Sequence, residues 1–512
     1  MYDVIVIGAG SVGSATAREL SKYRLKTLVL ERGHDICSGA SKANTGMIHA
    51  GYDPIPGTNE AKFNAPGNRM MYPLCDELDV PYQKSGTTIF ATDDSGMREL
   101  HKLKKFAIQN HVEAEIIPYP DLLEKQPDMG SEVRAILWVP EGGVTNPFSV
   151  TFALAENAYV NGVEFRLDSG VTGIDRVDRM TPAERELLPD GANFVVHTAE
   201  DAFPCRMIVN CAGLYSDVIN NMVSDIHFKI IPRFGAHIVL DRKLSSRLTT
   251  TLMETPHDLS GGGHTKGMAI APSIGGTMLL GCDATEVKDP DTTEWTMPSA
   301  QQIIEYFKKA WPILPLAKEC PEFPMDQIIA VFGGCRPHAD TNDFVIGEPE
   351  DAPNFVNAGG TESPAFTSSP AIGEYVAHIC IDRLAAEEKD DFNPYRKGKK
   401  VFRTMTDAEK KQAIAEDPDY ARIVCRCEMV TEAEIRDAIR RPLGARSVAG
   451  VKLRTRAGMG RCQGGFCSPR VVEILCEELG LDPLEVTQCG GNSQILMAPA
   501  CSLKAENEEV HE

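Results

Sequence analysis

The stretch that decides the fold class is MYDVIVIGAGSVG, residues Met1–Gly13. Val4–Ile7 is a β-branched run typical of a buried strand, and Gly8–Gly13 follows it as G-x-G-x-x-G. Glycines at these places allow a tight turn in which backbone N–H groups approach a pyrophosphate, and the helix expected over Ser14–Tyr23 adds the positive end of its dipole. The stretch therefore predicts a dinucleotide-binding unit and leaves NAD(P) and FAD open.

The choice between the two cofactors depends on segments farther along the chain. A second apolar strand, Thr27–Leu30, ends in Glu31, where a carboxylate is suited to bind ribose hydroxyls. Met207–Gly213 and Phe355–Gly360 again combine a strand with a small-residue turn. A simple NAD module is contiguous, whereas strand–glycine elements that return near residues 210 and 360 indicate a domain interrupted by an insertion. This pattern favours FAD.

Composition and charge limit the class of protein. The 512 residues are 42% hydrophobic and 24% charged, as in soluble globular proteins with about three domains. A net charge of −21 argues against nucleic acid as a partner and requires local cations in any pocket for an anionic substrate. No apolar run approaches 18 residues, so we expect no direct membrane span. Scattered cysteines and a strand at the start of the chain argue against a secreted protein, so we expect a cytoplasmic one, with any membrane association made through a partner.

The glycine loop, Glu31 and the segment Ser38–Gly51 together resemble FAD-dependent oxidases and dehydrogenases of the D-amino-acid oxidase type. Within that group residues 1–385 are most similar to glycerol-3-phosphate dehydrogenases and oxidases, and next to L-2-hydroxyglutarate dehydrogenases. The resemblance implies an α/β fold, in which a Rossmann-like FAD-binding domain carries an inserted, mostly antiparallel-sheet substrate domain.

Three segments resemble elements of the glycerol-3-phosphate group. Gly333–Pro337 resembles a Gly-x-Arg-Pro element whose arginine faces the substrate, and Thr361–Thr367 resembles Glu-Ser-Pro-Gly-Leu-Thr with Ala-Phe in place of Gly-Leu. Thr265–Pro272 is similar to a strand that bears a substrate-side lysine. Pro232–His237 departs from the group's Arg-Gly-Glu-Tyr, so we carry over no contact from it.

Oxidation of a secondary alcohol by FAD requires a hydride acceptor, a base for the hydroxyl proton and an anchor for the anionic end of the substrate. The resemblance implies His49 as the base, a role suited to the near-neutral pKa of histidine. Arg336 would bind a phosphate or carboxylate through two hydrogen bonds, Lys266 would add a second cation, and Ser363 would donate a hydrogen bond. Rival candidates for the base are His237, His264 and His338. The FAD-binding residues implied are Gly8, Gly10, Ser11, Gly13, Glu31, Arg32, Ser41, Asn44, Thr45, Gly46, Val171, Ala212, Gly213, Gly360, Thr361 and Glu362.

Four cysteines near the C-terminus form the most specific motif. They occur as Cys425-x-Cys427 and Cys462-x₄-Cys467, separated by 34 residues. A capping box at Thr431–Glu434 predicts a helix between the pairs, and Ser468 is expected to cap the next one. Four thiolates can bind zinc or an iron–sulfur cluster. The spacing resembles the 2Fe–2S domain of the bacterioferritin-associated ferredoxin type, in the version fused to anaerobic glycerol-3-phosphate dehydrogenases; zinc stays an alternative.

These observations predict an FAD-dependent dehydrogenase with a 2Fe–2S cluster. The expected domains are an FAD-dependent oxidoreductase domain over 1–390, a linker over 391–420, a helical 2Fe–2S domain over 421–490 and a tail over 491–512. Within the first, 1–80, 200–225 and 330–385 would bind FAD, and 80–200 and 225–330 would bind substrate.

The expected reaction converts sn-glycerol 3-phosphate to dihydroxyacetone phosphate, with electrons passed through the cluster to a partner subunit or carrier. A relay of single electrons favours a dehydrogenase over an oxidase, because reduced flavin reacts with O₂ directly. The alternatives are an L-2-hydroxyglutarate or other 2-hydroxy-acid dehydrogenase, an amine dehydrogenase, and an electron-transfer subunit that oxidises no substrate itself.

Overall fold

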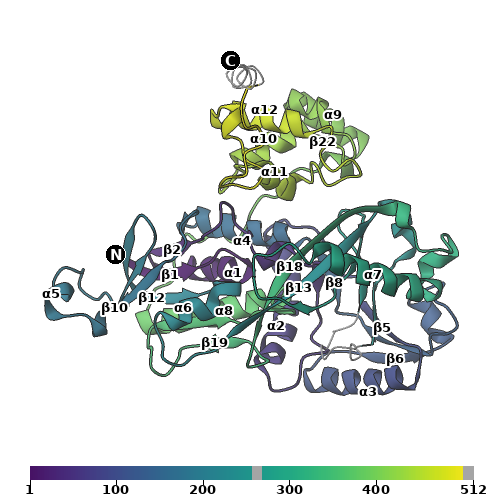
Figure 1. Cartoon of the computed structure of the whole chain (residues 1–512), viewed down its shortest axis with the longest axis horizontal. Coiled ribbons are helices and arrows are strands. Elements are labelled where there is room, and N and C mark those ends of the chain that lie inside the picture. Colours follow the sequence, from purple (N-terminus) through teal and green to yellow (C-terminus); the bar gives the residue numbers. More distant parts are fainter. Residues whose placement is uncertain (256–267, 500–512) are drawn as a thin grey trace, which may run out of the picture. The chain divides into compact units, whose positions relative to one another are not determined.

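The computed structural model describes residues 1–255 and 268–499 and divides into two units (Figure 1). Unit 1 comprises residues 1–32 and 36–397, and unit 2 comprises residues 33–35 together with the chain from residue 398 onward. Lys266 and His264 lie outside the described residues. No helix in the described ranges combines the length and apolar character needed to cross a bilayer.

The first sheet of unit 1 is built on five parallel strands, one of which is the strand that the opening sequence predicts. In spatial order these are β9 (Glu164–Arg166), β2 (Thr27–Leu30), β1 (Tyr2–Ile7), β12 (Ala202–Asn210) and β20 (Phe355–Gly359). Antiparallel additions are β10 (Gly173–Arg176), β11 (Phe194–His197) and β19 (Val345–Gly347). Ile5 and Ile7 of β1 are buried in a cluster with Phe194 and with Ile219 of α6 (Ser216–Asn221).

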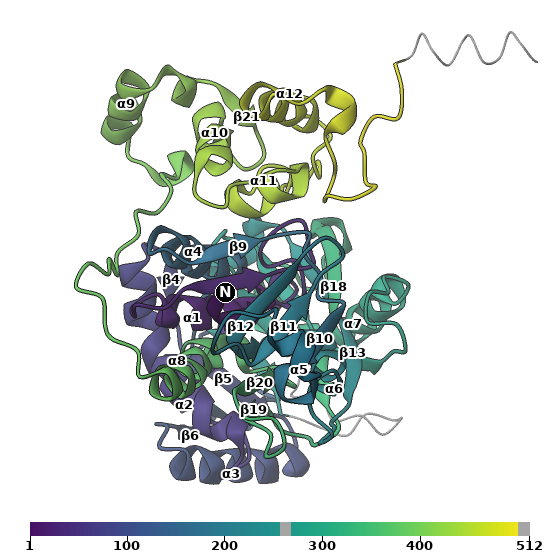
Figure 2. The ribbon, with the colours of Figure 1, turned by 90° about the vertical axis from the view of Figure 1, so that its left-hand side faces the viewer.

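Helices pack closely beside this sheet (Figure 2). α1 (Ser11–Leu20) contacts both α4 (Pro147–Val160) and α8 (Ala365–Leu384), and α8 also contacts α2 (Asn59–Glu77). The contact between α1 and α8 depends on Gly373, because a Cβ there would lie 2.8 Å from the backbone carbonyl carbon of Ala15. Small residues at such a crossing allow the two backbones to approach.

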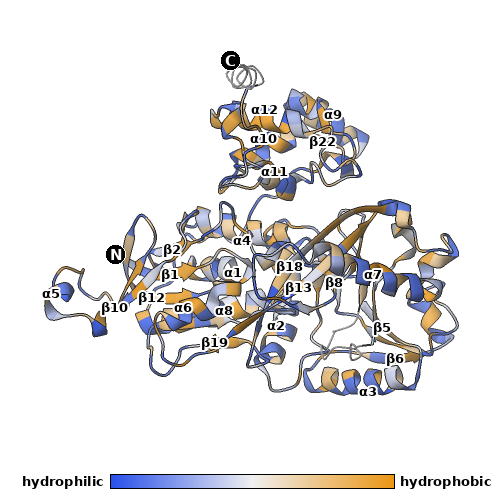
Figure 3. Ribbon diagram, viewed as in Figure 1, coloured by the Kyte–Doolittle hydropathy of each residue, from blue (hydrophilic) through white to orange (hydrophobic). Residues whose placement is uncertain are grey.

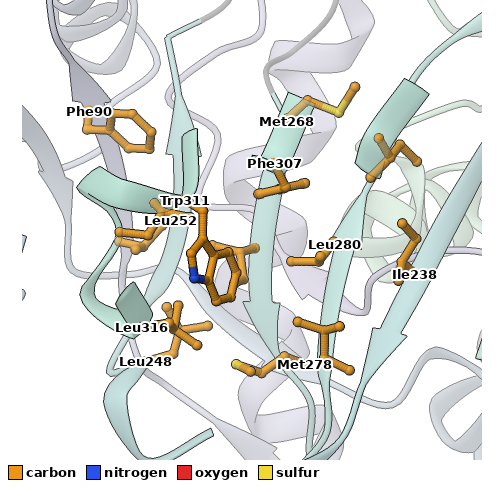
Figure 4. Close-up of a cluster of buried hydrophobic side chains, with 14 of the residues drawn as sticks. Phe90, Ile238, Leu248, Leu252, Met268, Met278, Leu280, Phe307, Trp311 and Leu316 are labelled. Carbon is orange, nitrogen blue, oxygen red and sulfur yellow. The ribbon is translucent and has the colours of Figure 1, made fainter. Parts of the chain in front are cut away.

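The second sheet is mostly antiparallel and carries its own core. Its strands run β17 (Thr285–Glu286), β13 (Ile230–Leu240), β16 (Met278–Gly281), β15 (Ala269–Pro272), β14 (Thr251–Glu254), β5 (Thr87–Ala91), β7 (Ala135–Val139) and β6 (Glu115–Pro118), with β18 (Ile328–Ala339) paired to β13. Phe307 of α7 (Thr296–Ala310) and the following Trp311 lie among Leu252, Leu280 and Ile238 in the core of this sheet (Figure 4).

Unit 1 also contains smaller elements outside the two large sheets. α3 (Asp94–Gln109) buries Leu100, Leu103 and Ala107 and shows hydrophilic residues between them (Figure 3). A small third sheet contains β3 (Met47–Ile48), β8 (Gly143–Thr145) and β4 (Tyr82–Gln83), and α5 (Pro182–Arg185) is a single turn.

The division of strands between the sheets differs from the sequence-based expectation. Residues 80–200 were assigned to the substrate part, but β9, β10 and β11 belong to the first sheet. Conversely, β18 was assigned to the FAD part but belongs to the second sheet. A short alternating strand carries no mark of its partner, because long-range pairing decides which sheet it joins.

The start of the expected linker also differs, because residues 391–397 belong to unit 1. Arg396 forms an ion pair with Glu156 at 2.7 Å, and the Asn393 carbonyl accepts hydrogen bonds from the side chains of Asn157 and Asn161. Polar residues that resemble a linker in the sequence therefore fasten this segment to α4.

Unit 2 is a small helical domain. It contains α9 (Asp407–Glu416), β21 (Ile423–Cys425), β22 (Val430–Thr431), α10 (Glu432–Arg440), α11 (Val448–Thr455) and α12 (Ser468–Leu479). The predicted capping box of Thr431 and Glu434 begins α10, and Gly480 ends α12 in a left-handed conformation. The predicted cap at Ser468 is wrong by one residue, since Cys467 occupies the N-cap position. Buried Glu432 forms ion pairs with Arg436 and Arg470 and thus joins α10 to α12.

We predict that Gly373→Ala lowers the melting temperature. In a free helix this change would be stabilising by about 1 kcal/mol. Here the new Cβ would separate α8 from α1, and overpacking of this kind costs about 1–3 kcal/mol. Gly173→Ala is the matched control, since a Cβ at Gly173 has no atom within 4 Å. Calorimetry of both variants decides the matter, and a higher melting temperature for Gly373→Ala would contradict the close crossing.

Candidate functional site

The glycine loop has the geometry that a pyrophosphate site requires. Gly8 has φ +103°, and a Cβ on it would lie 2.5 Å from the carbonyl oxygen of Cys211. A Cβ on Gly13 would lie 1.9 Å from the carbonyl oxygen of Gly8. Gly10 is the N-cap of α1 and supplies no side-chain cap, so the positive start of the helix is left for an anion.

Two predicted cofactor residues are held against this loop. The Oε2 of Glu31 accepts a hydrogen bond of 2.7 Å from the backbone N–H of Ala9, which places the carboxylate beside the loop. The hydroxyl of Ser41 accepts a hydrogen bond of 2.9 Å from the backbone N–H of Ser11. The structure thus brings the ribose and pyrophosphate candidates together.

The segment after Ser41 forms a tight turn. The Asn44 side chain donates to the Ser41 carbonyl and accepts from the Gly46 N–H, both at 2.9 Å. A Cβ on Gly46 would lie 2.1 Å from the Thr145 carbonyl oxygen, so the turn lies directly against β8. Thr45 is half-buried between Asn44 and Gly46.

The other predicted FAD residues have different surroundings. Arg32 has a half-exposed side chain that pairs with Asp291 at 2.8 Å and lies over the Tyr215 ring. Val171 packs against the core of the first sheet. Ala212 and Gly213 follow β12, Gly360 follows β20, and Thr361 is half-buried beside it.

The predicted substrate arginine lies on one face of the β13–β18 pair. In this register Arg336 is opposite Arg233, and Gly334 is opposite Gly235. Cys335, on the other face, belongs to the hydrophobic core. Alternation along the strand therefore places Arg336 and Gly334 on the face away from that core. A Cβ on Gly334 would lie 2.6 Å from the Cβ of Ala43, so this face meets the loop that leads to Asn44.

Arg336 is fixed by neutral groups. Its guanidinium donates to the main-chain oxygen of Asp283 and contacts the Cys282 thiol at 3.6 Å. In the part of the chain that the structure describes, it forms no ion pair with a carboxylate. A Cβ on Gly235 would lie 2.6 Å from Nη2 of Arg336 and 2.7 Å from the main-chain oxygen of Asp283, so only glycine fits at this position beside the arginine.

Sequence reasoning missed a polar cluster on the same face. Arg233 lies 3.6 Å from Glu286 and 3.9 Å from Glu362. Oε1 of Glu362 also lies 2.7 Å from Nδ1 of His338, which is buried, so the two side chains form a hydrogen bond or, when the imidazole is protonated, an ion pair. No single segment contains these residues, and only the cross-strand register of β13 and β18 brings them together. The cluster could have been found from the pairing of the two strands, which sets Arg233 opposite Arg336.

His49 is anchored through its backbone. Its N–H donates to the Thr367 hydroxyl at 2.9 Å, and its carbonyl accepts from the side chains of Asn64 and Asn68. The Thr367 hydroxyl in turn donates to Met47, which ties β3 to α8. Ser363 lies two residues before this helix, next to Glu362, and is the remaining predicted substrate contact within the described chain.

His237 is a weak candidate for the base. It is buried, stacks on Phe332 at 4.9 Å, and its Nδ1 has no hydrogen-bond partner among the described residues. Burial, together with the positive charge of Arg336, lowers the pKa of His237 to about 3. A base must have a pKa nearer to the working pH, so His237 acts on the shape and polarity of this face.

The four C-terminal cysteines meet as two pairs. The sulfur atoms of Cys427 and Cys462 are 3.6 Å apart, and the thiols of Cys425 and Cys467 are hydrogen-bonded to each other. A Cβ on Gly460 would lie 2.3 Å from the Cβ of Cys427, so a glycine is required for this approach. Among the described side chains, no three potential ligands surround a single metal position. Two pairs match a two-iron cluster, in which each iron takes two cysteines.

Hydrogen bonds prepare two of these sulfurs to be ligands. A hydrogen bond from the Cys467 thiol, with others from the backbone N–H groups of Gly458 and Glu428, lowers the pKa of Cys425 to about 6. The backbone N–H of Phe466 likewise lowers the pKa of Cys462. The partner thiols, on Cys427 and Cys467, have raised pKa values, because each lies beside the thiolate of its pair. Thiolates are the form that binds iron, so the backbone N–H groups of these loops fit the predicted cluster at Cys425 and Cys462.

Comparisons with known proteins agree with this geometry. Residues 3–379 match the model of the FAD dependent oxidoreductase family, and residues 423–477 match the BFD-like [2Fe-2S] binding domain. The chain is 39% identical over 505 residues to a glycerol 3-phosphate dehydrogenase of Caloramator mitchellensis, covering 98% of this chain and 99% of the relative. It is 29% identical to a glycerol 3-phosphate oxidase of Mycoplasma genitalium, covering 77% of this chain and 97% of that protein.

A solved structure supports the fold. The L-alpha-glycerophosphate oxidase of Mycoplasma pneumoniae, solved with FAD bound, has a TM-score of 0.67 and 26% identity, over 77% of this chain and 98% of that one. The predicted family, fold class and cofactors are thereby confirmed. The chain belongs to the FAD dependent oxidoreductase family and carries a C-terminal BFD-like [2Fe-2S] binding domain, which makes it an enzyme with two redox cofactors.

Proposed function

We propose that this enzyme oxidises sn-glycerol 3-phosphate to dihydroxyacetone phosphate and passes the electrons through its cluster to a partner subunit or carrier. The observation that carries the proposal is the cationic face of β13 and β18, where Arg233 and Arg336 are directly opposite each other. Support also comes from relatives named glycerol 3-phosphate dehydrogenase and oxidase.

Two like charges at facing positions on neighbouring strands repel each other. Glu286 and Glu362 beside Arg233 offset part of this repulsion, and a phosphate dianion bound between or beside the two arginines would offset the rest. Arg336 has only neutral acceptors, so its guanidinium is available to a phosphate as a planar, two-hydrogen-bond donor. Arg233, which is only loosely paired with two glutamates, would add the second positive charge, the role predicted for Lys266.

His49 is the proposed base. The backbone N–H of His49 donates to the Thr367 hydroxyl, which itself donates to the Met47 carbonyl. These two hydrogen bonds hold His49 between β3 and the start of α8. As the C2 hydride of the substrate leaves, the imidazole would take the hydroxyl proton, which leaves the ketone. FAD supplies the two-electron acceptor for that hydride, and the cluster supplies a one-electron exit.

An L-2-hydroxyglutarate dehydrogenase is the second candidate, because Arg336 could equally bind a carboxylate. The dehydrogenase of Arabidopsis thaliana is 25% identical over 73% of this chain and 83% of that protein. Anaerobic titration separates the candidates. We expect sn-glycerol 3-phosphate to bleach the flavin absorbance and to produce a reduced-cluster EPR signal. Bleaching by L-2-hydroxyglutarate or by an amine alone would replace the proposal, and bleaching by none would favour an electron-transfer subunit.

Replacement of the arginines should act on substrate binding. We predict that Arg336→Ala raises KM for glycerol 3-phosphate on the order of 100-fold, and Arg233→Ala about tenfold, because each removes a charge-assisted hydrogen bond to the phosphate. FAD content should be unchanged. Arg134→Ala, which removes an exposed arginine paired with Asp94, is the control. Normal KM in Arg336→Ala would remove this residue from the site.

The pH dependence of turnover should distinguish the two histidines. Since the pKa of His237 is about 3, this side chain is neutral at every pH from 5 to 9 and contributes no limb to the profile. We predict that His49→Asn lowers kcat by about 10²–10⁴-fold and abolishes the rise of kcat between pH 5 and 8. His237→Asn should keep that rise. Loss of the rise in His237→Asn alone would reverse the assignment.

A further inference from the structure

The two cysteine pairs of unit 2 differ in exposure. Cys425 and Cys467 are 1% and 2% exposed, whereas Cys427 is exposed and Cys462 is half-buried. A cluster held by the four residues therefore has a buried side and an open side. An electron can leave by close approach of another protein only on the open side, which is made by Cys427 and Cys462.

Large apolar side chains flank this open side. Phe466, next to Cys467, is 79% exposed, and Met429, two residues beyond Cys427, is 41% exposed. The hydrophobic core of unit 2 is formed by other residues, including Ile435, Ile474 and Leu475. Exposed aromatic and methionine side chains that the core does not use are typical of sites where another protein binds.

The charge around the open side is opposite to that of the whole chain. Residues 422–429 and 452–467 contain six basic residues and one acidic residue, in a chain of net charge −21. The acidic residue, Glu428, is buried and pairs with Arg403 and Arg456. Arg426 and Arg461, which are next to Cys427 and Cys462 in the sequence, are exposed. Part of this charge offsets the thiolates of the cluster, and the exposed arginines extend it to the surface.

We propose that Cys427, Met429, Cys462 and Phe466, with Arg426 and Arg461, form the docking surface for a small acidic protein that carries one electron at a time. This inference rests on the proposed relay and names the class of its acceptor. Phe466 and Met429 would provide the apolar contact, and the arginines would attract the acidic partner, as in transient electron-transfer complexes.

The electrons balance with two partner molecules. Oxidation of one secondary alcohol to a ketone releases two electrons and two protons. Each of two carriers binds in turn at this surface, accepts one electron and dissociates, and the protons pass to solvent. A short-lived complex suits this cycle, because the first carrier, once reduced, must dissociate before the second carrier can bind.

Rubredoxin, a small acidic one-electron protein, is the probe. We would photoreduce the full-length holoenzyme with deazaflavin, so that no substrate is needed, and follow reduction of rubredoxin by stopped flow. Phe466→Ala and Arg426→Glu should each lower the second-order rate constant about tenfold, and salt should lower it in the parent enzyme. Calorimetry with oxidised rubredoxin should show weaker binding for both variants.

Matched controls are Met497→Ala and Lys105→Glu, which change an exposed methionine and an exposed lysine distant in the sequence from the four cysteines. These should change the rate constant by no more than about twofold. The Arg426→Glu variant should reduce basic cytochrome c no more slowly than the parent enzyme does. Melting temperature and the cluster EPR signal establish that each variant is folded and loaded.

Three outcomes would overturn the docking surface. One is unchanged rubredoxin kinetics in both variants, and another is equal loss in the controls. The third is slowed flavin-to-cluster transfer after glycerol 3-phosphate with normal rubredoxin reduction, which would mean that the surface faces the FAD unit of the same chain. If glycerol 3-phosphate fails to reduce the flavin but photoreduced variants still lose rubredoxin reduction, the proposed substrate fails and the docking surface stands.

Discussion

The pairing of β13 with β18 is the contact on which the site depends. It joins residues 230–240 to residues 328–339 across about a hundred residues of chain. One register places Arg233 opposite Arg336 and Gly235 opposite Gly334, while the reverse face supplies Phe234 and Cys335 to the core. A shift of β18 by one residue against β13 would exchange the two faces of β18, so that Arg336 would point into the hydrophobic cluster. Burial of the apolar face thus fixes the register on which the arrangement of the polar face depends.

The parts of the fold that could be predicted are those that contiguous residues determine. The β-branched run before Gly8 and the glycines themselves determine strand, turn and helix locally, and the structure has all three. The cysteine spacing likewise predicts a cluster, because backbone turns near Gly460 and Gly464 are local. These features need no knowledge of distant partners.

What could not be predicted depends on pairing between distant segments. β9 to β11 were expected in the second sheet, and the short strands themselves contain no information against it. A role for Arg233 could not be predicted, because its segment departs from the family pattern. Its position on the same face as Arg336 follows from the strand pairing. The exposure that separates Cys427 and Cys462 from Cys425 and Cys467 is also a tertiary property. The role of Lys266 stays a prediction, since that residue lies outside the described ranges.

The glycine at 235 has a consequence for redesign of this enzyme. Nη2 of Arg336 and the main-chain oxygen of Asp283 both occupy the volume that any other residue at 235 would fill with its first side-chain carbon. A smaller residue at 336 would therefore not be enough to admit a side chain at 235, because the Asp283 oxygen would still lie 2.7 Å from its Cβ. A library that keeps Gly235 and varies position 336 would explore new acceptors for the charged end of a substrate, whereas joint variation of the two positions would sample mostly clashes with the backbone.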